Sequence, residues 1–412
     1  MNREVSDVII IGAGPAGAAT GAMLARQGYQ VTIIEKQHFP RFSIGESLLP
    51  QCMSFLKEAG LEPLIHDAAQ HLGFQYKDGA TFQKLDSYTS FDFEKKFSEG
   101  PFATYQVKRA DFDHLLAKGA AQFGADIRFG HAVEKVDVES DMPVLDVLNE
   151  QGEAYQLQGR FLLDASGFAR VLPRLLDLER PSCFPSRKSF FTHITDKIQC
   201  DQFDRNKILI TVHPESPDIW LWLIPFSDGT SSIGVVGKEA QFCARLTEQE
   251  TLKKYVYSAP NLAHLLQQAE WPNDVNSIKG YSADVTHLSG KNYALLGNAG
   301  EFLDPVFSSG VTIALKSASL ISPLVVKYLE GEKVDFKTQF EVPLRKGVDC
   351  FKTFVSAWYT AEFQDIIFYD EQDANVKSMI CSILAGYAWD EKNPYVAQSE
   401  RRLKVLVDLC RM

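Results

Sequence analysis

The feature that most constrains the fold is the start of the chain. A short apolar strand (8–11) runs directly into the turn Gly-Ala-Gly-Pro-Ala-Gly and a small-residue helix, and a second apolar strand (31–34) ends in Glu35. These glycines permit a tight turn, close approach of a pyrophosphate to the backbone, and close packing of the helix on the strand. The acid, about twenty residues further on, is placed to bind a ribose. The pattern predicts a Rossmann-type dinucleotide site whose cofactor ligands include Gly12, Gly14, Pro15, Ala16, Gly17, Glu35 and Lys36.

Composition narrows the class of protein. The 412 residues carry a net charge of -11, which argues against nucleic acid as a partner because phosphate binding needs clustered Lys and Arg. The seven cysteines occur singly, without CxxC or Cys/His spacing, so we expect reduced thiols and no metal site. The polar start before the first strand does not have the pattern of a signal sequence, so we expect none, and we expect no apolar run long enough to span a membrane. A cytoplasmic protein is the expectation.

Four later segments carry further cofactor candidates: KQHFPRFSIGESLLP, QVKRADFDHLL, FLLDASG and NYALLGNAGEFLDPVFSSGVTIAL. Separated segments that return to one nucleotide resemble flavoproteins of the para-hydroxybenzoate-hydroxylase type. The resemblance implies FAD, in an α/β (α+β) fold with a Rossmann-type FAD-binding domain of the glutathione-reductase kind. It adds as cofactor-binding residues Arg41, Ser43, Gly45, Glu46, Ser47, Arg109, Asp164, Ala165, Ser166, Gly167, Gly297, Asn298, Asp304 and Gly310.

The stretch DIWLWLIPFSDG places two tryptophans one residue apart in an apolar strand. Side chains alternate along a strand, so Trp220 and Trp222 project from one face while Leu221 and Leu223 project from the other. Neither face is built for water, which indicates a buried strand. The two adjacent indoles form a bulky wall beside some internal space.

With GESLLP, DASG and DPVFSSGV, the WxWxIP pattern at 220–225 makes nearly the whole chain resemble the flavin-dependent halogenases, closest to the branch that acts on phenols and pyrroles. The resemblance implies that reduced FAD and O2 give a C4a-hydroperoxide, which oxidises chloride or bromide to hypohalous acid. The oxidant then halogenates an electron-rich aromatic, free or tethered to a carrier protein. In the family the tryptophan strand lies beside the flavin and keeps organic substrate away from it.

The resemblance also assigns roles to individual residues. Lys77, in the context Lys-Asp-Gly-Ala, is the expected catalytic residue that guides the hypohalous acid. Phe307 stands where tryptophan-directed relatives carry a glutamate, which favours a substrate that is already activated. His193 is a candidate base, although a satisfied core histidine is the commoner situation. The implied halide and substrate pocket comprises Trp220, Trp222, Phe307, Ser308, Ser309 and Gly310.

Two departures from the family pattern keep alternatives open. Ile219 replaces the glycine before the first tryptophan, and Asn298 replaces the aspartate of the second flavin motif. An FAD-dependent aromatic hydroxylase, or a reductase or dehydrogenase of the geranylgeranyl-reductase kind, fits the same fold. A non-catalytic FAD protein is a third alternative. The sequence has no second GxGxxG for a nicotinamide, so a halogenase here would need a partner flavin reductase.

The motifs also divide the chain. We expect a discontinuous FAD-binding domain (1–75, 102–180 and 280–335) and a substrate domain (76–101 and 181–279) built on a mostly antiparallel sheet. Four strands are predicted in SFFTHITD, NKILITVH, DIWLWLIP and SSIGVVG, the last two joined by an Asp-Gly hairpin turn. Residues 336–412 are predicted to be mainly helical.

Overall fold

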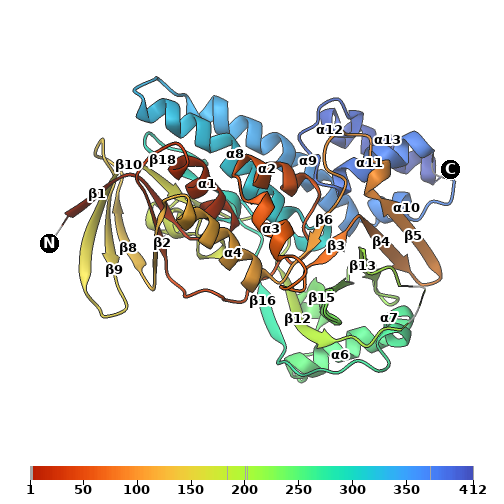
Figure 1. Ribbon diagram of the computed structural model, residues 1–412. Helices are drawn as coiled ribbons and strands as arrows, with labels where there is room; N and C mark the ends of the chain where they lie inside the picture. Colours follow the sequence, from red (N-terminus) through yellow and green to blue (C-terminus); the bar gives the residue numbers. More distant parts are fainter. Residues whose placement is uncertain (1–2, 183, 200, 202, 372, 412) are drawn as a thin grey trace.

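The computed structural model describes residues 3–182, 184–199, 201, 203–371 and 373–411. Its main elements are two seven-stranded sheets at opposite ends of the molecule, with helices between and above them (Figure 1). Cys183 and Cys200 lie outside the described residues; the five described cysteines are free thiols. The helices are α1 (Pro15–Ala25), α2 (Gln51–Glu58), α3 (Glu62–Ala68), α4 (Arg109–Gln122), α5 (Val171–Leu175), α6 (Glu248–Ser258), α7 (Pro260–Leu265), α8 (Ser309–Leu329), α9 (Val342–Tyr359), α10 (Glu362–Ile367), α11 (Ala374–Leu384), α12 (Pro394–Ala397) and α13 (Ser399–Cys410).

The first sheet is mixed and has the order β7-β2-β1-β10-β9-β8, with β18 added to the end of β10. The parallel strands β7, β2, β1, β10 and β18 form the doubly wound part, and β8 and β9 return as an antiparallel pair. The predicted Rossmann-type fold is confirmed. The strands are β1 (Arg3–Ile11), β2 (Val31–Glu35), β7 (Asp126–Phe129), β8 (Ala132–Asp137), β9 (Val144–Leu148), β10 (Ala154–Asp164) and β18 (Tyr293–Leu295).

The second sheet has the order β16-β12-β15-β14-β13-β4-β5, and all its pairings are antiparallel except β13 with β4. All four strands predicted for 181–279 are present, and the turn at Asp228-Gly229 joins β14 to β15. Its strands are β4 (Gly79–Lys84), β5 (Ser87–Asp92), β12 (Arg187–Thr195), β13 (Lys207–Val212), β14 (Trp220–Pro225), β15 (Thr230–Lys238) and β16 (Asn276–Lys279).

Two small pairs, β3 (Gln75–Lys77) with β6 (Thr104–Gln106) and β11 (Glu179–Arg180) with β17 (Asp284–Val285), connect the two halves. The described residues between 336 and 411 are mainly helical, as predicted; they form the helices α9 to α13, which lie beside β4 and β5 (Figure 1).

Strand β14 divides two hydrophobic cores by alternation. Trp220 and Trp222 pack into the large core that also holds the first sheet and α8, whereas Leu221 and Leu223 pack into a second core under α6 and α7. All six residues of β14 are buried. The predicted two-faced burial of this strand is confirmed.

Helix α8 differs from expectation. It is long and apolar enough to cross a membrane by length and composition, although no such run was expected. Because 67% of its most apolar stretch is buried inside the protein, and because it packs against α1, α2 and α9, α8 serves as a core helix here.

Candidate active site

A cavity of ≈ 950 Å³ lies where the fingerprint loop, the loop after β2, the DASG turn, the loop before α8 and strand β14 meet. Its size is that of a ligand site, which is commonly about 300–1,000 Å³. The predicted residues in its wall are Gly12, Gly14, Pro15, Ala16, Glu35, Lys36, Arg41, Ser43, Gly45, Glu46, Ser47, Arg109, Ala165, Ser166, Gly167, Trp220, Trp222, Asn298, Ser308 and Gly310. Those that stand behind the wall are Gly17, Lys77, Asp164, Gly297, Asp304, Phe307 and Ser309.

The glycines of the fingerprint are required by close contacts. Gly12 has φ +95°, and a Cβ there would lie 2.5 Å from the carbonyl oxygen of Ala165. A Cβ on Gly17 would lie 1.9 Å from the carbonyl oxygen of Gly12, so Gly17 allows α1 to pack against the turn. The N-terminus of α1 therefore faces the cavity, where its free N–H groups and dipole favour a phosphate.

Glu35 holds the edge of this turn. One carboxylate oxygen accepts from the Ala13 N–H at 2.9 Å and the other from the Gln37 N–H at 2.9 Å. The side chain is buried but still lines the cavity, so its remaining lone pairs face the space where a ribose would lie.

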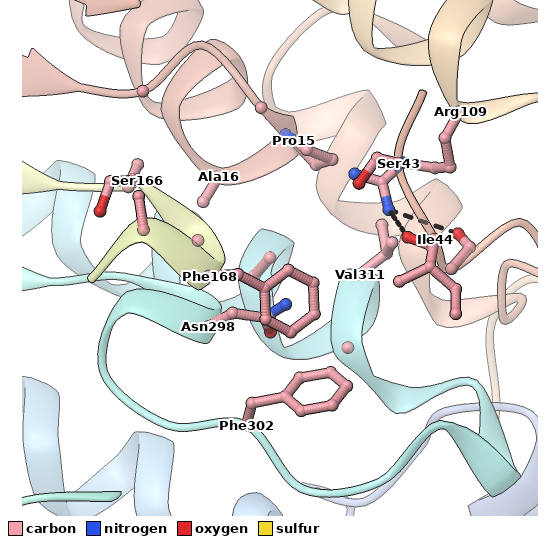
Figure 2. A pocket seen from close by; sticks show the side chains of 18 of the residues that line it. Pro15, Ala16, Ser43, Ile44, Arg109, Ser166, Phe168, Asn298, Phe302 and Val311 are labelled. Atoms are coloured by element: carbon pink, nitrogen blue, oxygen red, sulfur yellow. Dashed lines mark hydrogen bonds between the residues drawn. The ribbon is translucent and has the colours of Figure 1, made fainter. Parts of the chain in front are cut away.

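Two arginines fix the opposite loop through one buried acid. Arg109 and Arg41 both bind Asp113, with N···O distances of 2.8 Å, and Asp113 is fully buried. Arg109 also donates to the carbonyl oxygen of Ile44 at 2.7 Å, which holds that loop against the cavity (Figure 2). The pairing compensates the buried charges.

The far side of the cavity is formed by the DASG turn and the loop after β18. Asp164 accepts from the backbone N–H groups of Ser166 (2.8 Å) and Leu172 (2.6 Å), so it shapes the turn and does not enter the cavity. Phe168 and Phe302 project into the cavity with ring centroids 5.0 Å apart, and Asn298 lies between them and α8 (Figure 2). The sequence signal for these two rings was only their position next to DASG and NAGE.

The residues that line this cavity suit FAD as the bound cofactor. The oxygen Oδ1 of Asn298 is buried and has no hydrogen-bond partner among the described residues, yet its residue lines the cavity. A buried polar atom without a partner costs free energy unless a ligand satisfies it. A ribityl hydroxyl would do so, and the fingerprint loop would hold the pyrophosphate.

The two indoles wall one end of the cavity. Their ring centroids are 5.8 Å apart. Trp222 donates from Nε1 to Ser232 Oγ at 3.1 Å, and Trp220 donates from Nε1 to Tyr359 Oη at 2.9 Å. Both indole N–H groups are thus satisfied by the protein, that of Trp222 by Ser232 in the cavity wall and that of Trp220 by Tyr359 behind it, which leaves the apolar ring surface to face the cavity.

Behind Trp220 lies a buried polar network that the sequence did not reveal. Tyr359, at the end of α9, hydrogen-bonds Asp304, and Tyr281 Oη lies 3.4 Å from Asp304 Oδ2. The guanidinium of Arg187 lies 3.3 Å from the centre of the Tyr359 ring. Burial raises the pKa of Asp304 to about 6, despite the hydrogen bond from Tyr359 and the charge of Arg187. Asp304 therefore positions the tryptophan wall from outside the cavity.

Lys77 is fully enclosed, one hydroxyl away from the cavity. Its Nζ donates to Ser47 Oγ and to the carbonyl oxygen of Leu48, both at 2.7 Å, and Ser47 lines the cavity. The ring of Phe93 lies 5.6 Å from Nζ. Burial lowers the pKa of the Lys77 amine from 10.5 to about 7.

The segment 307–310 splits between the wall and the core. Ser308, with φ +57°, and Gly310 line the cavity at the N-terminus of α8, and Ser309 is buried beside them. Phe307 was expected in the halide and substrate pocket, but it packs against Trp358 (5.8 Å between centroids) and Phe363 (5.4 Å). Its ring therefore packs among aromatic side chains of α9 and α10, away from the cavity wall.

Comparisons with known proteins agree with this site. A family model described as an FAD binding domain matches residues 5–286. The 1H-pyrrole-2-carbonyl peptidyl-carrier-protein chlorinase of Pseudomonas fluorescens is 28% identical, over 99% of this chain and 95% of its own. Several other curated halogenases are longer, and the chain spans 62% to 68% of their length.

Two solved structures show the same architecture. A flavoprotein/dehydrogenase from Cytophaga hutchinsonii is 39% identical, has a TM-score of 0.94 and is matched over 99% of both chains. The myxobacterial chondrochloren halogenase is 27% identical with a TM-score of 0.73, over 99% of this chain and 97% of its own. FAD is therefore the cofactor of this cavity, the chain is similar over nearly its whole length to flavin-dependent halogenases, and it belongs to the FAD-binding domain family.

Proposed function

We propose that this protein oxidises chloride or bromide to hypohalous acid and that Lys77 passes the oxidant to an electron-rich aromatic, a phenol or a pyrrole. Reduced FAD, when bound, supplies together with O2 the two-electron oxidation of the halide. The observation that carries the proposal is the buried amine of Lys77, which is hydrogen-bonded to the cavity-lining Ser47.

The geometry at Lys77 suits an amine that reacts with an oxidant. With a pKa of about 7, a large share of the side chain is neutral at physiological pH. A neutral amine has two N–H groups, and the two acceptors Ser47 Oγ and Leu48 O use both of them. The nitrogen lone pair is then free to attack HOX, which gives an N-halo amine and water. Such capture keeps a diffusible oxidant inside the protein.

The remaining wall residues have supporting roles in this proposal. The N–H groups at the start of α8, beside Ser308 and Gly310, would hold the halide, because a helix N-terminus and oriented amides favour an anion. Trp220 and Trp222 would keep the organic substrate apart from the flavin, since their apolar faces close that end of the cavity.

The proposed substrate follows from Phe307 and from the relatives. An aromatic ring, not a carboxylate, stands before Ser308, so the substrate must bring its own electron density, as a phenol or pyrrole does. The curated chlorinase and a related brominase are named for a pyrrole on a peptidyl carrier protein. We propose an aromatic substrate that is free or carrier-bound, a partner flavin reductase that supplies reduced FAD, and a cytoplasmic location.

The test separates oxidant formation from oxidant transfer. Photoreduced holoenzyme is mixed with O2 and bromide, taurine is added to trap hypohalous acid, and phenols and pyrroles are offered as acceptors. Lys77→Met is expected to bind FAD normally and to deliver hypobromous acid to taurine, but to lose aromatic bromination. Lys207→Met, which changes a lysine paired with Asp78 and Asp204 outside the cavity wall, is the matched control. Aromatic bromination by Lys77→Met at the wild-type rate would refute the role of Lys77.

A second candidate rests on the Cytophaga relative, which is described as a flavoprotein/dehydrogenase. A dehydrogenase or reductase would pass electrons between FAD and an organic substrate in the same cavity. In the experiment above, it would form no N-bromotaurine at any bromide concentration, whereas a halogenase forms it in proportion to bromide.

A further inference from the structure

We propose that Glu46 and His193 form a proton relay that links the flavin cavity to solvent and supplies the proton that halide oxidation consumes. The inference rests on the proposed function, because the balance of that reaction requires it. Reduced flavin, O2, X⁻ and H⁺ give oxidised flavin, HOX and H2O. One proton must therefore be delivered to the reacting atoms with each halide that is oxidised.

Glu46 is the carboxylate suited to deliver that proton. It belongs to the loop that contains Ser47, the hydrogen-bond partner of Lys77, and it lines the cavity while only 3% of its side chain is exposed. The other ionisable groups in the wall have different settings. Glu35 is engaged by the fingerprint loop, and Arg41 and Arg109 are paired with Asp113. Four ionisable groups remain in the wall, and they come from segments next to the fingerprint and the first sheet: Lys36, His131, Glu134 and Arg174.

His193 connects Glu46 to the outside. Its Nε2 lies 2.8 Å and 3.0 Å from the two carboxylate oxygens of Glu46, and 23% of its side chain is exposed. The other ring nitrogen, Nδ1, has no hydrogen-bond partner in the described part of the chain. The imidazole is thus bonded to a buried acid through Nε2 and keeps Nδ1 unpaired, so that it can accept a proton at one nitrogen and donate one from the other.

The surroundings hold the ring in place. His193 lies on β12 two residues after the cavity-lining Phe191, so both side chains project from the same face of the strand. The rings of Phe42 and Phe226 contact it edge-on, at 5.7 Å and 5.4 Å between centroids.

Nearby charges are already paired. Lys108 forms an ion pair with Asp228 beside Phe226, and Asp196, three residues further along from His193, pairs with Arg205. Glu46 is the acidic side chain to which the ring itself is hydrogen-bonded.

The transfer needs three steps at named atoms. Solvent protonates Nδ1 of His193, the proton on Nε2 passes to an Oε of Glu46, and the resulting carboxylic acid releases its proton into the cavity. No bond other than O–H and N–H changes. The histidine is left neutral as the Nδ1–H tautomer, and it returns to the Nε2–H form by exchanging protons with water before the next transfer.

The relay predicts a binding effect that is independent of turnover. A halide and the Glu46 carboxylate carry like charge in one enclosed space, so halide binding should draw a proton onto the pair. Calorimetric titration of bromide into the FAD-loaded protein, in two buffers of different ionisation enthalpy, measures the protons taken up per halide. Wild type is expected to take up a measurable fraction of a proton, and Glu46→Gln none, with both proteins titrated at the same FAD occupancy, set by fluorescence quenching.

The kinetic arm uses hypohalous acid trapped by taurine. Glu46→Gln and His193→Ala are each expected to slow its formation about a hundredfold, a typical contribution of general acid–base catalysis. Imidazole should restore the rate of His193→Ala but not that of Glu46→Gln. His213→Asn, which changes a histidine bonded to Ser258 outside the cavity wall, is the matched control and should behave as wild type. His193→Asn provides a second variant if the alanine variant folds poorly.

The outcomes are distinguishable. Equal proton uptake and equal oxidant formation in wild type and Glu46→Gln would overturn the relay while the proposed function stands. Absence of both bromide binding and hypobromous acid in wild type would overturn the proposed function and the relay with it. A slow His193→Ala variant that imidazole does not rescue would reduce His193 to a structural partner of Glu46.

Discussion

Replacing Lys77 with methionine should flatten the pH dependence of folding stability between pH 7 and pH 8.5. The folded-state pKa of this amine is about 7 because burial removes it from water, whereas the unfolded chain has the ordinary value of 10.5. The folded-state pKa is therefore depressed. With respect to this amine, the folded protein is most stable above pH 10.5, where both folded and unfolded chains are neutral. That stability is lost as pH falls through 7.

The size of the effect follows from the shift, which is about 3.5 units (10.5 less about 7) at about 1.36 kcal/mol each. At pH 7 the amine costs the folded state about 4 kcal/mol, because the unfolded chain is protonated there and the folded chain is only half so. At pH 8.5 that cost falls to about 2.5–3 kcal/mol. The wild-type protein should therefore gain about 1.5 kcal/mol from Lys77 between pH 7 and 8.5.

Urea unfolding of the FAD-loaded protein at several pH values in this window gives the measurement, read as the difference in slope between wild type and Lys77→Met. The absolute stability of the variant is not the readout, since methionine also leaves Ser47 and Leu48 without their donor. Lys207→Met is the control, because ion pairing keeps the pKa of Lys207 above 10.5 and it does not titrate below pH 8.5. Identical slopes in wild type and Lys77→Met would refute a desolvated amine at this position.

Two other substitutions test the cofactor side of the cavity. Asp304→Asn should remove a pH dependence at acid pH: burial raises the pKa of Asp304 from 3.8 to about 6, so its stabilising effect is complete below pH 3.8 and is lost as pH rises through 6. Wild type should lose about 2 kcal/mol from this group between pH 4.5 and 7.5, and urea unfolding should show no such loss in the variant. Gly17→Ala should abolish FAD binding, measured by fluorescence quenching, since its Cβ would lie 1.9 Å from the Gly12 oxygen. Gly28→Ala is the control: its φ of +88° makes alanine unfavourable there and lowers stability, but its Cβ would meet no atom within 4 Å, so the folded variant should bind FAD as wild type does.

The fold was predictable wherever the signal was local. The fingerprint, the alternation of WLWLIP and the Asp-Gly turn each depend on a few neighbouring residues, and each appears where the sequence placed it. Helix α8 was misjudged because an apolar helix at the centre of a large core has the composition of a membrane span, and only its neighbours distinguish the two.

The candidate site was predictable in its cofactor half and not in its proton and support networks. The spacing of residues within a motif indicates their role, and most of the site residues named from the sequence line one cavity. The contact of His193 with Glu46 spans 147 residues and that of Trp220 with Tyr359 spans 139. No local pattern encodes such a pair, because the approach is set by how the second sheet and α9 pack onto the FAD domain.

The position of Phe307 links the support network to the choice of substrate. Its ring is enclosed by Trp358 and Phe363, so a carboxylate at this position would be buried among rings without a partner, at a cost of several kcal/mol. The helices α9 and α10 that enclose it also carry Tyr359, which holds Trp220 through its indole N–H. The C-terminal helices therefore exclude a base at Phe307 and fix the tryptophan wall at the same time. A site without a base at this position suits a substrate that is already activated, such as a phenol or a pyrrole.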